Sequence, residues 1–227
     1  MAEITFHSMP DSAYLWTAMM VAAEKGVAYA FEPLEYGSAE HLKLHPFGKM
    51  PVFQHGEVFL YETLAIAHYI DRAFDGPPLQ PASPLGQAQM LRWVGVVNAY
   101  VFPVMNRFMK ERLVRPAFGF DPDADFLASA EAPLRVQLRV IDEALQAGAY
   151  LCGDRLTIAD CFLLPHLLFF SLTPEGAALI AERPGLAGWL ARLQGRPSYQ
   201  ASPMSQTFGR FSQMPRPQDR VWADLPA

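Results

Sequence analysis

The sequence predicts two domains of different class, an α/β domain at the N-terminus and an all-helical domain after it. Three observations support this prediction. Short β patterns alternate with helical patterns over the first 76 residues, a Pro- and Gly-rich stretch follows, and the rest shows helical patterns without a convincing strand. We place the first domain at residues 1–76, the linker at 77–85 and the helical domain at 86–227, which ends in a Pro-rich tail.

The N-terminal domain begins with a β-α-β pattern. Residues 4–7 alternate apolar and polar side chains like a strand, and residues 13–25 carry apolar side chains at helical spacing before Gly26. Ser12 precedes this helix in the position of an N-cap. Residues 27–34 form the second strand, so the unit has the size of a parallel crossover.

The remainder of this domain predicts a loop, a hairpin and a helix. Pro and Gly punctuate residues 37–51, which favours a loop. Residues 50–54 and 55–60 are typical of two strands joined by a tight turn, and a helix runs from residue 62 to about residue 73. The expected result is a small mixed sheet with helices.

In the second domain, a long helical stretch over residues 85–115 is expected to bend near Pro103. Further helices are predicted at residues 126–147, 158–172 and 186–193. The tail from Pro197 is expected to wrap the surface.

Composition excludes several classes of function. Of the 227 residues, 51% are apolar and 18% charged, which is typical of a globular protein. The net charge of −5 without a dense basic run argues against a nucleic-acid partner. The longest apolar run, residues 161–170, is too short for a bilayer, and the N-terminus lacks a signal pattern. The two cysteines form no CxxC motif, so we expect no disulfide framework. Together these observations lead us to expect a cytoplasmic protein with no membrane span. We also expect no metal.

Residues 45–51, His-Pro-Phe-Gly-Lys-Met-Pro, resemble the signature Asn-Pro-x-Gly-x-Val-Pro of the cytosolic glutathione S-transferase superfamily, with His45 in place of Asn. Residues 153–160 resemble the helix-capping box of the same superfamily, and residues 183–199 resemble its final helix. The three matches occur in order and cover nearly the whole chain. The chain is identified as similar to the Ser-type members, which are phi- or theta-like or bacterial.

The resemblance implies a thioredoxin-like glutathione-binding domain followed by a helical bundle that holds the second substrate. It implies a transferase that activates the thiol of its co-substrate glutathione for attack on a small apolar electrophile. Detoxification, a cytoplasmic location and a homodimer are also expected from it. Within the capping box, Thr157 and Asp160 are interpreted as folding residues, because they satisfy the free N–H groups of a buried helix start.

Ser12 is the predicted catalytic residue, because it lies at a helix N-terminus and matches the catalytic serine of the Ser-type classes. Lowering a thiol pKa from about 8.5 by two units requires about 2.7 kcal/mol. A hydroxyl that donates to the anion contributes about 1.5–3 kcal/mol, and a helix N-terminus adds about 0.3–1 kcal/mol. A helix cap alone is the simpler role for Ser12, and Ser8 or a backbone N–H is the alternative partner of the sulfur. His7 is expected to lie on the strand surface.

The resemblance also assigns the contacts with glutathione. Thr63 opens a helix whose N–H groups suit the γ-glutamyl carboxylate, and Glu62 suits the amine. Met50 precedes Pro51, which the family holds cis, and this exposes the Met50 backbone to the cysteinyl amide. Lys49 either meets the glycine carboxylate or is a solvated loop residue.

The second substrate is expected between the domains, against the first helix of the helical domain. The candidates for this electrophile site are the Met, aromatic and amide side chains Tyr100, Met105, Asn106 and Phe108. For each of them, a place in the helical core is the simpler interpretation.

Two other functions remain open from the sequence. One is a glutathione-dependent isomerase, dehalogenase or ether-cleaving enzyme on the same fold. The other is a non-catalytic interaction module, although such members often lose the glutathione contacts that Glu62, Thr63 and Pro51 retain here.

Overall fold

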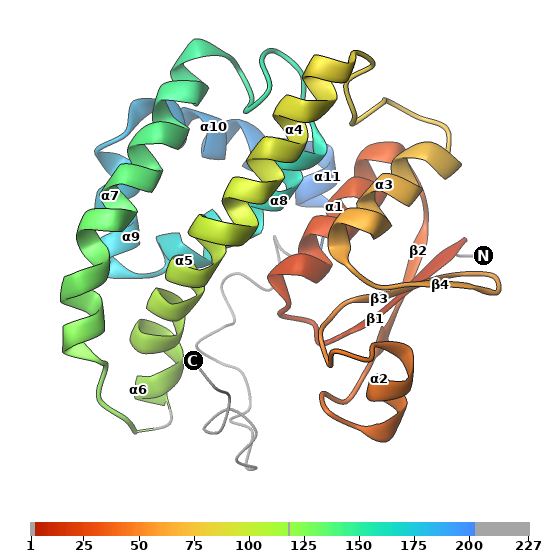
Figure 1. Ribbon diagram of the computed structural model, residues 1–227, viewed down its shortest axis with the longest axis horizontal. Coiled ribbons are helices and arrows are strands. Elements are labelled where there is room, and N and C mark those ends of the chain that lie inside the picture. The colour runs from red at the N-terminus through yellow and green to blue at the C-terminus, as the bar shows by residue number, and fades with distance from the viewer. Residues whose placement is uncertain (1–2, 118, 203–227) are drawn as a thin grey trace.

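The computed structural model describes residues 3–117 and 119–202, and it places a sheet-containing part beside a helical part (Figure 1). The first part consists of β1 (Ile4–Ser8), α1 (Ala13–Lys25), β2 (Tyr29–Pro33), α2 (Ala39–Leu44), β3 (Val52–His55), β4 (Val58–Leu60) and α3 (Thr63–Ala73). The second part consists of α4 (Pro84–Val96), η1 (Val97–Val101), α5 (Phe102–Met109), η2 (Lys110–Val114), α6 (Arg115–Ala117), α7 (Ala124–Ala147), α8 (Ile158–Ser171), α9 (Pro174–Ala181), α10 (Pro184–Gln194) and α11 (Pro197–Gln200). The predicted fold class is confirmed.

The sheet has the strand order β2-β1-β3-β4. β1 pairs parallel with β2 and antiparallel with β3, and β3 pairs antiparallel with β4. Alternate residues of β1 are buried, among them Ile4 and Phe6, because the pleat sends successive side chains to opposite faces. The β-α-β unit and the hairpin predicted from the sequence are both present.

Helix α1 connects the cores of the two parts. It packs on α3 in the sheet domain and on α8 in the helical domain. Its Trp16 ring stacks on Phe169 of α8, with 4.7 Å between ring centroids. Gly26 ends the helix in the left-handed conformation, with φ 73°, which glycine adopts without steric penalty. The N-terminus of α1 is thereby held at the boundary between the domains.

Several elements differ from the sequence-based expectation. α2 lies inside the predicted loop, where Ser38 caps it by accepting from the His41 N–H. α9 begins at Pro174, in a stretch for which no helix was predicted. The structure places the π-helical stretch η1 just before α5, which contains Pro103, and the bend expected there stays a prediction. The first part of the Pro-rich tail is the helix α11, which contacts α1, and residues 203–227 lie outside the described residues.

Among the described residues, no single helix is long and apolar enough to cross a membrane. Only α8 and α9 taken together reach that length and composition, and a bend of 119° separates them.

Candidate active site

Ser12 is the N-cap of α1, with φ −71° and ψ 119°. Its Oγ accepts a hydrogen bond from the Leu15 N–H at 3.3 Å, and its side chain is half-buried. A hydroxyl has one proton and two lone pairs, so accepting from the helix leaves the proton available for a second partner. Ser12 can therefore cap the helix and donate to an anion at the same time.

The two neighbouring candidates are less available than Ser12. Ser8 is 0% exposed, and its Oγ has no hydrogen-bond partner among the described residues. His7 lies along the sheet, with its Nε2 at 3.0 Å from Gln54 Oε1 and its Nδ1 at 3.2 Å from Glu32 Oε2. Both nitrogens of His7 are thus engaged with neighbouring strands.

The loop before β3 presents a backbone edge near the start of α1. The peptide bond between Met50 and Pro51 is cis. The Met9 N–H, in the turn that leads to Ser12, donates to Met50 Sδ at 3.0 Å. Lys49 is exposed, and its carbonyl oxygen lies 2.9 Å from His41 Nε2. The structure therefore brings Lys49, Met50 and Pro51 to the side of the turn that carries Ser12.

The turn into α3 is strained. Glu62 has φ 69° and ψ 109°, and it is the one described residue other than glycine with positive φ. Such strain costs about 1–3 kcal/mol and is frequent at ligand sites. Glu62, the N-cap residue, makes no side-chain hydrogen bond to the helix, so it leaves the first N–H groups of α3 uncapped, and Thr63 begins that helix at 7% exposure. These features suit the binding of an anion.

His45 lies beside this turn. It is 1% exposed, its ring centroid is 4.7 Å from that of Tyr61, and its Nδ1 has no hydrogen-bond partner in the part of the chain that the structure describes. Burial lowers the pKa of His45, while the charge of Glu62 opposes that shift. A neutral imidazole therefore replaces the usual Asn at this position.

Sequence reasoning missed the contribution of Tyr14. Its hydroxyl donates to Asn98 Oδ1 at 3.0 Å, across the boundary between the domains. Its ring lies against Phe102 and His166, each with 5.0 Å between centroids. Burial raises the pKa of Tyr14, and the charge of Glu62 raises it further, so the phenol stays protonated. No local pattern signals a contact between residues this far apart in the chain.

The four candidates for the electrophile site do not share one surface. Tyr100 is 61% exposed and Asn106 is half-buried, whereas Met105 and Phe108 are each 1% exposed. Phe108 packs against Phe126 and Phe170 in the helical core. Of the four, Asn106 is the one with intermediate burial.

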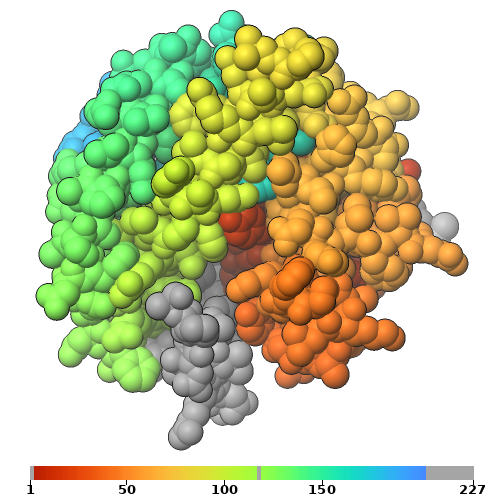
Figure 2. All heavy atoms as spheres, in the orientation of Figure 1, coloured from red at the N-terminus to blue at the C-terminus, as the bar shows by residue number. Residues whose placement is uncertain are grey.

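Figure 2 shows atoms of the N-terminal segment at the bottom of a hollow between the α2–α3 region and the α4–α5 region.

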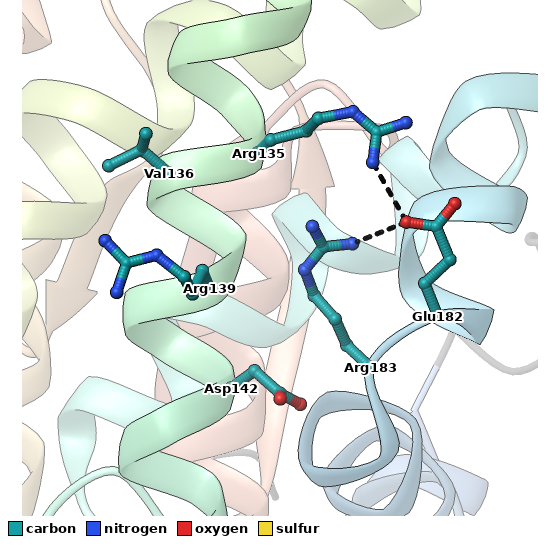
Figure 3. Close-up of a pocket in the computed structure, with 6 residues that line it drawn as sticks. All are labelled: Arg135, Val136, Arg139, Asp142, Glu182 and Arg183. Atoms are coloured by element: carbon teal, nitrogen blue, oxygen red, sulfur yellow. Dashed lines mark hydrogen bonds and ion pairs between the residues drawn. The ribbon is translucent and has the colours of Figure 1, made fainter.

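Two cavities lie elsewhere, in the helical domain. The cavity in Figure 3, of about 310 Å³, is lined by Arg135, Val136, Arg139, Asp142, Glu182 and Arg183. In it, Glu182 pairs with two of the arginines. The other cavity, of about 440 Å³, includes Phe108 and the ion pair of Arg112 with Glu175. Ser12 lines neither of them.

Within the part of the chain that the structure describes, no group of three or more His, Cys, Asp or Glu side chains is placed to hold a metal ion.

Two family models match the chain. The model of the glutathione S-transferase N-terminal domain matches residues 2–72, and that of the C-terminal domain matches residues 124–192. Glutathione S-transferase 3 of Zea mays is 31% identical over 209 residues, which cover 88% of this chain and 93% of the relative. Probable glutathione S-transferase GSTF2 of Oryza sativa subsp. japonica is 30% identical over 207 residues, which cover 88% of this chain and 95% of the relative.

Solved structures agree with the sequence comparisons. The apo form of glutathione S-transferase III is similar at a TM-score of 0.81 and 29% identity, over 95% of this chain and 100% of that one. Glutathione S-transferase I from maize, in complex with an atrazine glutathione conjugate, gives a TM-score of 0.80 and 25% identity. The match covers 96% of this chain and 100% of that one. Family models, relatives and structures all agree, and the chain therefore belongs to the glutathione S-transferase family and is a glutathione transferase.

Proposed function

We propose that the Ser12 hydroxyl activates the glutathione thiol by donating a hydrogen bond to the sulfur. The observation that carries this proposal is the position of Ser12 at the N-terminus of α1, half-buried and with its proton available. The hydroxyl and the helix N-terminus together supply about 2–4 kcal/mol, which lowers the thiol pKa by about two units. Most of the bound thiol is then ionised at neutral pH and attacks the electrophile.

The rest of glutathione binds along two edges of the sheet domain. The backbone of Met50, next to the cis Pro51, pairs with the cysteinyl amide. The uncapped N–H groups of α3 and the Thr63 hydroxyl receive the γ-glutamyl carboxylate, and the exposed Glu62 receives the amine. Lys49, in the same loop as Met50 and Pro51, binds the glycine carboxylate. A relative from Xanthomonas axonopodis pv. citri, 28% identical, has been solved with glutathione bound.

The electrophile binds in the hollow between the domains, next to the sulfur. We place it against Tyr14 and Phe102, whose half-buried aromatic rings lie on the two sides of the domain boundary, with Asn106 further along the same helix. Tyr100 is largely exposed, and Met105 and Phe108 belong to the buried core of the helical domain. Apolar walls with few polar groups are typical of such pockets.

The protein acts in the cytoplasm as a homodimer, with detoxification of apolar electrophiles as its role. A cluster of exposed apolar side chains, Leu42, Phe47 and Tyr61, supports a contact with a second copy of the chain. Phe47 is 71% exposed, and exposed apolar side chains that form a contiguous patch mark interaction sites. Twofold dimers are the commonest soluble assembly.

Calorimetry with glutathione, followed by a turnover assay with a chloronitrobenzene-type electrophile, tests the proposal. We expect glutathione to bind at the concentrations at which it occurs in cells, and we expect the thioether product to form. Binding without turnover would support the non-catalytic module instead. No heat at millimolar glutathione would exclude the proposed glutathione site altogether.

A further inference from the structure

The side chain of His41 is enclosed between the start of α2 and the loop that precedes the cis proline. It is 0% exposed. Its Nδ1 accepts from the Gly37 N–H at 3.0 Å, so the ring proton resides on Nε2. Nε2 donates it to the carbonyl oxygen of Lys49 at 2.9 Å. A single neutral imidazole therefore joins two loop segments.

The Lys49 carbonyl belongs to the peptide unit that also contains the Met50 N–H. A peptide unit is planar, and in the trans form its C=O and N–H point in opposite directions. Fixing the Lys49 oxygen on one side thus fixes the direction of the Met50 N–H on the other. The Met50 side chain is held separately, by the Met9 N–H that donates to its Sδ. Met50 is therefore held through the Lys49 carbonyl of its peptide unit and through its own sulfur, directly before cis Pro51.

We propose that His41 is a positioning residue of the glutathione site, which orients the Met50 backbone toward the cysteinyl amide through its bond to Lys49. This inference rests on the proposed function, because it assigns the Met50 backbone to glutathione. His41 touches neither the sulfur nor the electrophile, so it acts on affinity and leaves the chemical step unchanged. Without the imidazole, the Lys49–Met50 peptide loses its fixed direction, and glutathione must order it on binding.

Two substitutions separate the functions of the two ring nitrogens. In His41→Gln, the side-chain amide reaches the position of Nε2 and keeps a donor for Lys49. In His41→Asn, the shorter amide reaches the position of Nδ1, so it keeps an acceptor for Gly37 and loses the donor to Lys49. Both variants place an uncharged amide in the same buried space, which makes each the matched control of the other.

We expect His41→Asn to raise the Kd for glutathione by about tenfold, which is the loss of one buried hydrogen bond. His41→Gln should stay within about threefold of the wild type, since it retains the bond that orients the peptide. At saturating glutathione, kcat should stay within about twofold in both, and the thiolate pKa of bound glutathione should not move. Calorimetry and steady-state kinetics measure these quantities, with thermal melts to confirm folding.

Equal Kd values for the wild type and both variants would overturn the inference, and so would a lower kcat with an unchanged Kd. If the wild type itself does not bind glutathione, the proposed function fails, and this inference fails with it. A second measurement needs no variant: ¹⁵N spectra of the wild-type imidazoles should show His41 as the neutral Nε2–H form. The Nδ1–H form would contradict the assigned bonds.

Discussion

In the proposed site, different side chains bind glutathione and activate its thiol. Ser12 lies at the start of α1, where the sulfur is expected, whereas Glu62 and Thr63 lie at the start of α3. In the proposed binding mode, the first N–H groups of α3, which follow the strained turn at Glu62, receive the opposite end of the tripeptide. Substitutions at the two helix starts should therefore change different kinetic parameters.

Replacing Thr63 with Ala should weaken glutathione binding by about 1.5–3 kcal/mol, because a donor to a carboxylate is lost. The turnover number at saturating glutathione should stay within about twofold, since Thr63 is not placed at the sulfur. Steady-state kinetics against glutathione check this, and Thr63→Ser, which keeps the hydroxyl, is the control. An unchanged KM with a collapsed kcat would contradict this division of roles.

At the scale of elements, helix α8 depends on one buried carboxylate. Asp160 Oδ1 accepts from the Leu151 N–H at 2.9 Å and from Trp189 Nε1 at 3.0 Å. Its Oδ2 accepts from the N–H and the hydroxyl of Thr157, each at 2.9 Å. Burial raises the pKa of Asp160, and the four donors oppose that shift. The carboxylate joins three segments, as expected of a folding residue.

Asp160→Ala should therefore destabilise the protein by about 3 kcal/mol or more, since four donors lose their acceptor. Urea unfolding measures this loss. Asp125→Ala is the matched control, because Asp125 is an exposed acid in the first turn of α7. The folded fraction of Asp160→Ala should keep its kcat, and a variant with full stability but no activity would show that Asp160 is not a folding residue.

His166 of α8 makes stability depend on pH. It is 4% exposed, and burial lowers its pKa from 6.5 to about 3. Between these values the unfolded chain binds a proton that the folded chain excludes, so stability is complete above about pH 6.5 and is lost as the pH falls. This residue should add up to about 1.4 kcal/mol per pH unit to the slope of unfolding free energy. Urea unfolding from pH 4 to 7 should show a shallower dependence of the unfolding free energy on pH in His166→Leu than in the wild type. Identical pH dependences would refute this role of His166.

The elements most regular in sequence were the ones predicted. The apolar spacing of α1 and the long apolar run of α8 mark both helices, and the Pro- and Gly-rich loop before the hairpin marks β3. α2 was missed because it spans only Ala39–Leu44, which gives less than two turns of periodicity. For the proposed site, Ser12, Glu62 and Thr63 were predicted from their positions at helix starts together with the family resemblance. The bond from Tyr14 to Asn98 forms across 84 residues and depends on domain packing.

At the scale of the whole molecule, contacts at both ends of α1 hold the domains together. At one end Tyr14 bonds Asn98. At the other, Glu24 receives Arg196 through two bonds, of 2.6 and 2.7 Å, and also accepts from Ser198. The domain boundary, where we place the electrophile, is therefore braced on two sides. A second copy of the chain is proposed to cover the exposed cluster of Leu42, Phe47 and Tyr61.

Phe47→Ser should weaken the dimer, because it removes a large apolar side chain from the centre of the proposed contact. Sedimentation at micromolar protein should give a dimer for the wild type and a shift toward the 25.3 kDa monomer for the variant. Phe120→Ser, at a position 54% exposed in the helical domain, should leave the dimer intact. A wild-type monomer at these concentrations would count decisively against the dimer.

The central claim, that Ser12 stabilises the thiolate, is tested most directly by the ultraviolet absorbance of the bound glutathione thiolate against pH. In Ser12→Ala the curve should move up by about one to two pH units, and turnover at neutral pH should fall about tenfold to a hundredfold. The matched control is Ser83→Ala, because Ser83 caps α4 through the Gly86 N–H at 3.1 Å and lies outside the site. Both variants should lose about 1 kcal/mol of stability as caps, and only Ser12→Ala should shift the titration. If the curves of the wild type and Ser12→Ala coincide, Ser12 is only a cap, and Ser8 or a backbone N–H is the partner of the sulfur.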